Sequence, residues 1–131
     1  MNKFINMTLI IGLIGFNSYA NAGECKPKKH AKVPNISEKS YHQARKMLIA
    51  NQWKPNRTLS ANSTESDLGF GNGWYFWSKG YKEVEACAGT GTAPCVFNFK
   101  DKYGNGLKVY TQGEDGGGFY ARVSGYHFEC N

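Results

Sequence analysis

Several signatures that would assign a chemistry are missing from this chain of 131 residues. It has no Gly-x-Ser-x-Gly nucleophile motif, no phosphate-binding glycine loop and no EF-hand pattern. Its four cysteines form no Cys-x-x-Cys pair, and its three histidines are not spaced like metal ligands. No apolar run reaches the roughly 20 residues that a transmembrane helix needs. The sequence therefore predicts no cofactor and no membrane-spanning helix, and it indicates no particular reaction.

The N-terminus has the pattern of an export signal. Lys3 supplies a positive charge, residues 7–16 are apolar, and Ala20-Asn21-Ala22 is the small-x-small sequence after which signal peptidase cuts. We therefore expect residues 1–22 to be a cleaved signal peptide. Residues 23–131 would then form one small domain in the periplasm or outside the cell.

The four cysteines all lie within this expected domain. An even number of cysteines in a small exported chain predicts disulfides. Cys87 and Cys95 flank a short connection rich in small residues, so a hairpin would bring them within bonding distance. Three pairings are possible, and the one that contains this local bridge leaves Cys25–Cys130 to tie the ends of the domain together. In the chain-entropy model the short loop contributes about 2.5 kcal/mol and the long one about 5 kcal/mol.

Positive charge is concentrated in the first part of the domain. Residues 23–57 contain nine lysines and arginines against two acids, whereas residues 58–131 contain six against eight. Such a surface is either a solvated face that aids solubility or a contact for an anionic partner, such as a lipid headgroup, a surface glycan or an acidic protein. Export argues against nucleic acid.

The clearest local pattern predicts a helix that ends near Asn51. Ser40 and Gln43 form a capping box at its start, and its outer face carries Arg45 and Lys46. Asn51 is the expected left-handed terminator. The apolar residues that recur at helical spacing are Tyr41, Ala44, Met47 and Leu48.

Most of the remaining chain predicts strands and turns. Ser60–Gly73 is expected to be a mobile loop, Lys102–Gly106 a hairpin turn and Glu114–Gly118 a flexible turn. The fold class is α+β: one N-terminal helix packed on a mostly antiparallel sheet of five to six strands, in two disulfide-stabilised layers. The expected strands are Val33–Ile36, Trp53–Pro55, Val84–Cys87, Cys95–Phe99, Leu107–Thr111 and Phe119–Phe128.

An aromatic cluster follows the expected loop, in the stretch Gly73–Tyr81. We interpret it as extended, so that alternate rings face opposite sides. Exposed rings would form a stacking platform for a sugar or a protein, and the alternative is that the rings fill the core. The candidate binding residues are Trp74, Tyr75, Trp77 and Tyr81, together with Arg45 and Lys46.

Two chemical alternatives remain open. Glu83 and Glu85 would share one face of a strand and could act as acid and base together with a histidine. Glu114 and Asp115, with Asp101 from a neighbouring turn, could hold calcium. The histidines that are available are His30, His42 and His127.

The chain also has two resemblances. Residues 33–55 resemble the first strand and helix of a PASTA domain, a module of cell-wall proteins, although the downstream Gln-x-Pro pattern of that family is missing. The wider resemblance is to a family of small secreted disulfide-containing proteins of Gram-negative bacteria, and it implies export and disulfides but no activity. Its other members carry an extra cysteine pair before Gly80. The motifs that match are Tyr41-x-x-Ala44-Arg45-x-x-Leu48, Trp53-x-Pro55, Gly80-Tyr81-x-Glu83, Cys87-x-Gly89-Thr90-Gly91, Cys95-x-Phe97 and Cys130.

These features together predict a monomeric, non-catalytic envelope protein that binds a macromolecular partner. The partner would be an anionic cell-wall or surface glycan, or an envelope protein that this chain inhibits or neutralises as an immunity protein. The alternatives are a small periplasmic hydrolase that uses a Glu/His pair, and a structural subunit of an envelope complex.

Overall fold

The computed structural model describes residues 25–60, 62–68 and 71–130. The expected signal peptide, residues 1–22, lies outside the described residues. The elements are α1 (Tyr41–Ala50), β1 (Lys54–Pro55), the 3₁₀ helix η1 (Glu65–Leu68), α2 (Gly73–Ser78), β2 (Val84–Cys87), β3 (Cys95–Lys100), β4 (Gly106–Gln112) and β5 (Arg122–Glu129).

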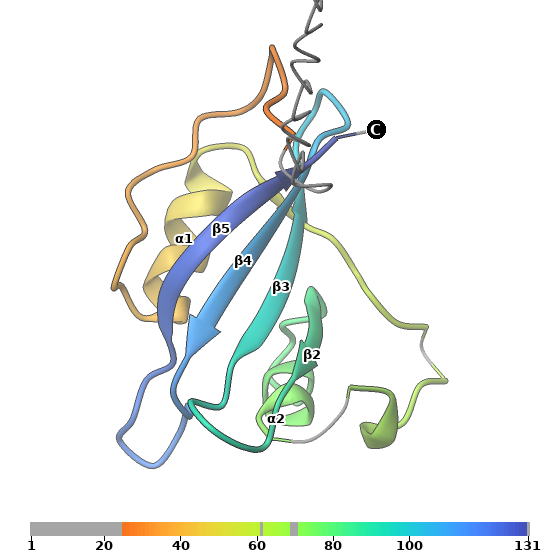
Figure 1. Ribbon diagram of the computed structural model, residues 1–131. Coiled ribbons are helices and arrows are strands. Elements are labelled where there is room, and N and C mark those ends of the chain that lie inside the picture. Colours follow the sequence, from red (N-terminus) through yellow and green to blue (C-terminus); the bar gives the residue numbers. More distant parts are fainter. Residues whose placement is uncertain (1–24, 61, 69–70, 131) are drawn as a thin grey trace, which may run out of the picture.

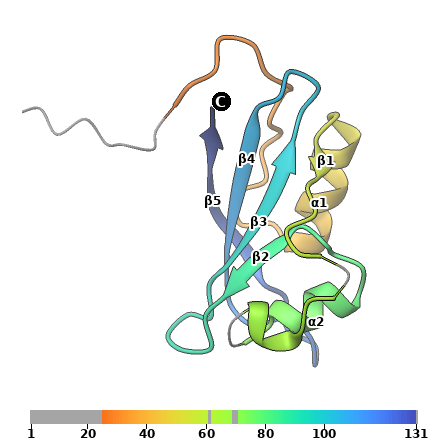
Figure 2. The same cartoon turned by 90° about the vertical axis from the view of Figure 1, so that its right-hand side faces the viewer.

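The five strands form one antiparallel sheet, and both α-helices lie on the same side of it (Figure 1, Figure 2). The strand order is β1-β3-β4-β5, and β2 also pairs with β3. The predicted α+β architecture, with an N-terminal helix packed on a mostly antiparallel sheet, is confirmed.

Alternating side chains of the central strands build the core beneath α1. Phe97 of β3 and Leu107 of β4 are at most 1% exposed. The predicted helix begins at its predicted cap, where Ser40 Oγ accepts a hydrogen bond from the backbone N–H of Gln43 at 3.2 Å. The residues that α1 buries in this core are Tyr41, Ala44 and Leu48.

The end of α1 differs in one detail from its prediction. Asn51 has a φ of −97°, and the left-handed residue is Gln52 with a φ of 71°, so Asn51 was the wrong terminator. The N–H of Gln52 donates to the carbonyl of Ile49, and that of Trp53 donates to Leu48. These two hydrogen bonds form a Schellman motif, which turns the chain directly into β1.

The aromatic stretch is a short helix, α2, and the prediction of an extended segment was wrong. Gly73, Phe76 and Trp77 are buried at the i, i+3, i+4 spacing of a helix, and tertiary packing outweighs the β propensity of the aromatic residues. Gly80, with a φ of 94°, ends the helix in a second Schellman motif. In that motif the N–H of Tyr81 donates to the carbonyl of Phe76, which returns the chain towards α1.

The loop expected between Ser60 and Gly73 is partly ordered. It contains η1, whose Leu68 is fully buried, so the loop does contribute to the core. A Cβ at Gly73 would lie 2.9 Å from the Cβ of Leu68. Glycine at this position therefore lets η1 pack tightly on α2.

The strand expected at Val33–Ile36 is absent, and the chain instead makes hydrogen bonds to β5 slightly later, at Glu38 and Lys39. The N–H of Glu38 donates to the carbonyl of Val123 in β5, and the N–H of Val123 donates to Lys39.

Both predicted disulfides are present. Cys87 and Cys95 are direct cross-strand partners with Cα atoms 4.1 Å apart, and the Cα atoms of Cys25 and Cys130 lie 5.8 Å apart. Two disulfides fit the oxidising conditions outside the cytoplasm. No helix among the described residues is long and apolar enough to cross a membrane.

Candidate binding site

The loop between β4 and β5 lies at the lower end of the molecule in Figure 1. It carries two strongly exposed aromatic side chains. Phe119 is 72% exposed and Tyr120 is 59% exposed. They were expected in the last strand, but β5 begins only at Arg122. Gly116 and Phe119 instead exchange two backbone hydrogen bonds, with N···O distances of 2.9 and 3.1 Å. The two glycines between them have φ values of 60° and 89°, and a type I′ turn requires positive φ at both positions.

Asp115 fixes the base of this loop. It is 7% exposed, and its Oδ1 accepts a hydrogen bond from the backbone N–H of Ala121 at 3.1 Å. Its Oδ2 lies 2.7 Å from Nε2 of His42 on α1. The loop predicted to be flexible is therefore held at its base by a buried carboxylate.

The calcium site considered from the sequence is not formed. Asp101 precedes β4 and Asp115 follows it, so the two carboxylates lie at opposite ends of one strand. Each of them accepts backbone N–H groups. The described residues contain no cluster of three histidine, cysteine or acidic side chains that could hold a metal ion.

His42 joins this loop to the end of α2. Because a carboxylate can only accept, Nε2 of His42 donates to Asp115, and in the neutral ring Nδ1 accepts from the hydroxyl of Tyr81 at 2.7 Å. Burial raises the pKa of the Tyr81 phenol, and the positive charge of Arg45, 4.4 Å from the ring centroid, offsets this only in part. Tyr81 is therefore a neutral phenol at physiological pH, and both nitrogens of His42 are engaged.

An ion pair between the half-buried Arg45 and the buried Glu83 lies next to this network. Glu83 is 0% exposed and accepts hydrogen bonds from Arg45 Nε at 2.5 Å and from the Tyr41 hydroxyl at 2.8 Å. Burial and the charge of Glu83 raise the pKa of Tyr41 well above its usual value. Burial lowers the pKa of Arg45, but the hydrogen bond to Glu83 and the negative charge of Glu83 together outweigh burial, so the pKa is raised overall. The outer face of α1 is thus tied to the chain just before β2.

A hollow of about 330 Å³ lies between the loop and α2, next to His42. The Tyr75 ring forms one wall and packs against Gly116, where an added Cβ would lie 3.2 Å from the Tyr75 hydroxyl. The ammonium of Lys79 lies over this ring, 4.5 Å from its centroid. We call Tyr75, Lys79, Phe119 and Tyr120 the aromatic tip.

The predicted binding residues are divided between this site and the core. Tyr75 belongs to the tip, Tyr81 lies beneath it, and Trp74 is half-buried against the core. Trp77 is only 6% exposed, and both Arg57 and Lys82 lie over its ring, so it offers no stacking platform.

The two predicted basic residues differ as well. Arg45 forms an ion pair with Glu83, so its charge is partly compensated within the fold. Lys46 is exposed on α1 as expected. Neither residue lines the hollow at the aromatic tip.

The pattern Gly116-Gly117-Gly118 followed by two aromatic residues was the only local indication of the tip. It was interpreted as a flexible turn that leads into a strand. The partners His42 and Asp115 are 73 positions apart in the chain, so no local spacing could have joined them.

The two glutamates considered for acid–base chemistry face different surroundings. Glu83 is buried with Arg45, whereas Glu85 accepts two hydrogen bonds from Lys108 Nζ at 2.9 Å on the helix-free side of the sheet. A β-bulge between Val84 and Ala86 separates them. Neither glutamate bonds to a histidine among the described residues, so the expected pair on one face is not formed.

No protein-family model, curated protein or solved structure matches this chain.

Proposed function

We propose that this chain is an exported, non-catalytic binding protein that engages a protein partner through the aromatic tip. The observation that carries the proposal is the exposure of Phe119 and Tyr120 on a hydrogen-bonded turn. Exposed aromatic side chains held in a fixed geometry are typical of binding hot spots, because little conformational entropy is lost when they are buried.

The geometry supports binding better than catalysis. His42 shares both its ring nitrogens with Asp115 and Tyr81, and the raised pKa of Tyr81 keeps that phenol protonated. The network therefore lacks a free base and a phenolate nucleophile. Its evident role is to hold the loop against α1 and α2.

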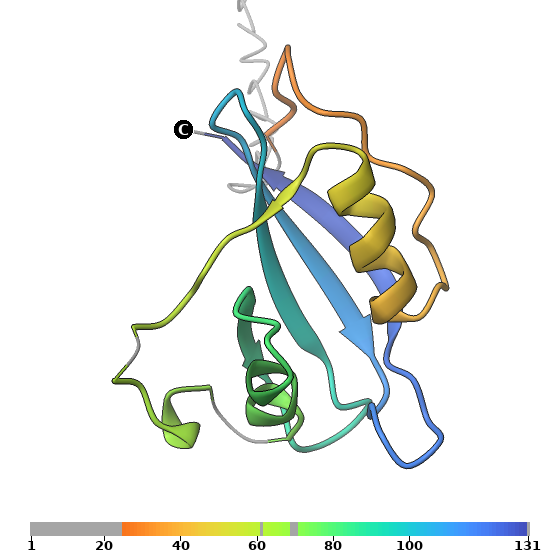
Figure 3. The ribbon, with the colours of Figure 1, turned by 180° about the vertical axis from the view of Figure 1, so that it is seen from behind.

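A protein fits the tip better than a glycan does. The rings of Phe119 and Tyr120 dominate the exposed surface, and both nitrogens of His42 are already engaged by Asp115 and Tyr81, so they cannot select sugar hydroxyls. The loop projects from the end of the sheet, so it suits a concave surface such as the cleft of an exported enzyme or toxin (Figure 3). An inhibitor or immunity protein is the form that this function would take. The net charge of +6 favours a neutral or acidic target over a basic one.

The test is affinity capture from the envelope fraction of the source cells with four purified oxidised proteins. These are the wild type, Phe119→Ala, Tyr120→Ala and, as a matched control, Tyr126→Ala, whose aromatic ring is 44% exposed on β5. We expect one protein to be recovered by the wild type and the control. Each tip variant should lose at least about ten-fold of the recovery, as hot-spot truncations do.

The binding constant of the recovered protein is then measured for all four proteins by calorimetry. Equal affinity for wild type and both tip variants would overturn the proposal. Recovery of wall glycan with no protein would also overturn it.

A further inference from the structure

The opposite end of the molecule carries an exposed cluster of lysines around one tyrosine. Lys54 in β1 and Lys100 in β3 are direct cross-strand partners, and both are exposed. Just beyond β3, the ammonium groups of Lys29 and Lys102 both lie over the Tyr103 ring, 5.1 and 5.2 Å from its centroid. We call these five residues the basic end.

The described residues leave this positive charge uncompensated. None of their carboxylates lies within 4.0 Å of the ammonium groups of the basic end, whereas Lys108 on the same sheet pairs with both Glu85 and Glu129. Like charges directly opposite one another destabilise a sheet. The pairing of Lys54 with Lys100 therefore carries an energetic cost, and an external anion would relieve the repulsion.

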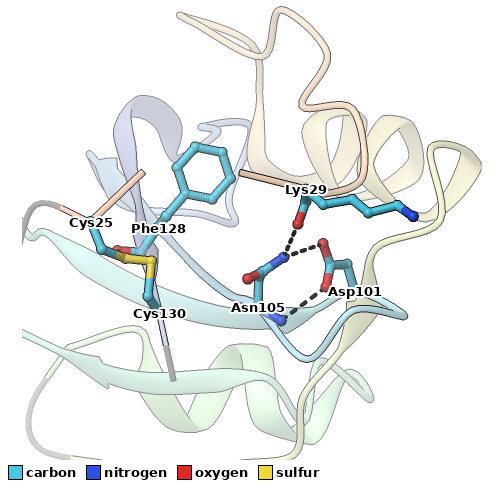
Figure 4. The surroundings of a disulfide bond; sticks show 6 residues. All are labelled: Cys25, Lys29, Asp101, Asn105, Phe128 and Cys130. Atoms are coloured by element: carbon cyan, nitrogen blue, oxygen red, sulfur yellow. Dashed lines mark hydrogen bonds between the residues drawn. A yellow bond between two sulfur atoms is a disulfide. The ribbon is translucent and has the colours of Figure 1, made fainter. Parts of the chain in front are cut away.

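Two acids lie at this end of the sheet. Glu129 of β5 is in register with Gly106 and pairs with Lys108, and Asp101 is turned inward. Asp101 is 8% exposed, and it accepts hydrogen bonds from the backbone N–H groups of Ala31 at 2.9 Å and Tyr103 at 3.0 Å. Asn105 donates from its side chain to Asp101 and to the carbonyl of Lys29, so the turn and the N-terminal segment form one unit (Figure 4). The lysines are thus displayed on an ordered base.

The shape of this end indicates the kind of anion. The β3–β4 turn projects beyond the sheet at the upper end in Figure 1, with the segment after Cys25 beside it. A projecting turn can lie on a broad surface. Tyr103 is 41% exposed at its crest, and tyrosine side chains favour the headgroup layer of membranes, where their ring is half buried and their hydroxyl hydrated.

We propose that the basic end docks on a membrane surface rich in anionic phospholipid headgroups. The lysines contact lipid phosphates, and Tyr103 enters the headgroup layer. The aromatic tip lies at the other end of the sheet and stays accessible in this orientation. The proposal is independent of the function of that tip.

The test is co-sedimentation of the oxidised protein with vesicles of phosphatidylcholine, with and without about 30% phosphatidylglycerol. We expect binding only to the anionic vesicles and its loss in about 0.5 M NaCl, since salt screens the lysines. Each lysine near an anionic surface is worth about five-fold in affinity, so Lys100→Gln/Lys102→Gln should bind about 30-fold more weakly. Tyr103→Ala should also weaken binding.

The matched control is Lys39→Gln/Lys46→Gln, which removes the same charge from the region of α1. It should bind the anionic vesicles within about three-fold of the wild type, because its lysines lie away from the proposed surface. An equal loss in both double variants would overturn the proposal, because attraction would then follow net charge alone. Binding to soluble polyphosphate without binding to the vesicles would overturn it in favour of a phosphate polymer.

Discussion

At each end of β4 an aspartate is buried beneath a turn, and the two turns display opposite chemistry. Asp115 accepts hydrogen bonds from the backbone N–H of Ala121 and from the imidazole of His42. The turn above it presents the uncharged rings of Phe119 and Tyr120. Asp101 accepts the N–H groups of Ala31 and Tyr103, and the turn above it presents lysines. A buried carboxylate that accepts backbone donors can therefore order a turn while the exposed residues remain free to serve binding.

The two ends also carry one disulfide each, and the first prediction compares them. Cys25–Cys130 closes 105 positions of chain at the basic end, whereas Cys87–Cys95 closes 8 near the aromatic tip. The chain-entropy model predicts that removing the first bridge costs about 5 kcal/mol and removing the second about 2.5 kcal/mol. Urea denaturation of Cys25→Ala/Cys130→Ala and Cys87→Ala/Cys95→Ala measures both values. A larger loss from the short bridge would show that native packing near the tip, rather than chain entropy, sets the order.

The second prediction removes the cation of the ion pair that lies next to the network of the tip. Arg45→Met leaves the fully buried carboxylate of Glu83 without its charge partner, which should lower the free energy of unfolding by about 3 kcal/mol. Adding Glu83→Gln should recover part of that loss, because a neutral amide no longer needs the cation. Lys46→Met is the control on the same helix and should change stability by less than about 0.5 kcal/mol. The measurement is urea denaturation of the wild type and the three variants, and a double variant less stable than Arg45→Met would contradict the assignment.

The sequence predicted the fold better than it predicted the binding surfaces. The reason is that the fold follows from patterns between residues close in the chain, whereas the surfaces depend on contacts between residues far apart in it. The stripe of Tyr41, Ala44 and Leu48, and the cysteines that flank one hairpin, are local patterns that one packing arrangement satisfies. Contacts such as Arg45 with Glu83 depend on how α1 lies on the sheet, so no spacing reveals them. The place of Arg45 on an outer helix face therefore gave no sign of its ion pair.

The same limit explains why α2 was missed. Phe76 and Trp77 favour strands by propensity. Long-range packing buries the short helix instead, since Phe76 contacts the rings of Tyr41 and Phe97 and η1 packs against Gly73. Only Lys29 and Lys54 of the basic end lie in the segment whose composition is basic, and the pairing of Lys54 with Lys100 follows from strand register. Register over two paired residues leaves almost no mark in sequence.

The third prediction, with the smallest expected effect, tests whether the basic end rests on Asp101. Burial raises the pKa of Asp101, but hydrogen bonds from Asn105, Ala31 and Tyr103 outweigh this and hold the pKa below the usual value of 3.8. Because the folded pKa is the lower one, the stabilisation is complete above about pH 4 and is lost as the pH falls towards the folded pKa. Asp101→Asn should therefore cost about 2 kcal/mol at pH 7, with the difference from wild type shrinking below pH 4.

The control is Glu114→Gln, which removes the same charge from an exposed position beside the tip. It should leave the loss of stability below about pH 4 the same as in the wild type. The measurement is the free energy of unfolding in urea between about pH 2 and pH 7 for the three proteins. A constant difference between wild type and Asp101→Asn across this range would mean that the carboxylate acts by shape alone. In that case the charge of Asp101 would not order the β3–β4 turn, and its likeness to Asp115 would be one of packing alone. The turn would then be ordered by the hydrogen bond from Asn105 to the carbonyl of Lys29.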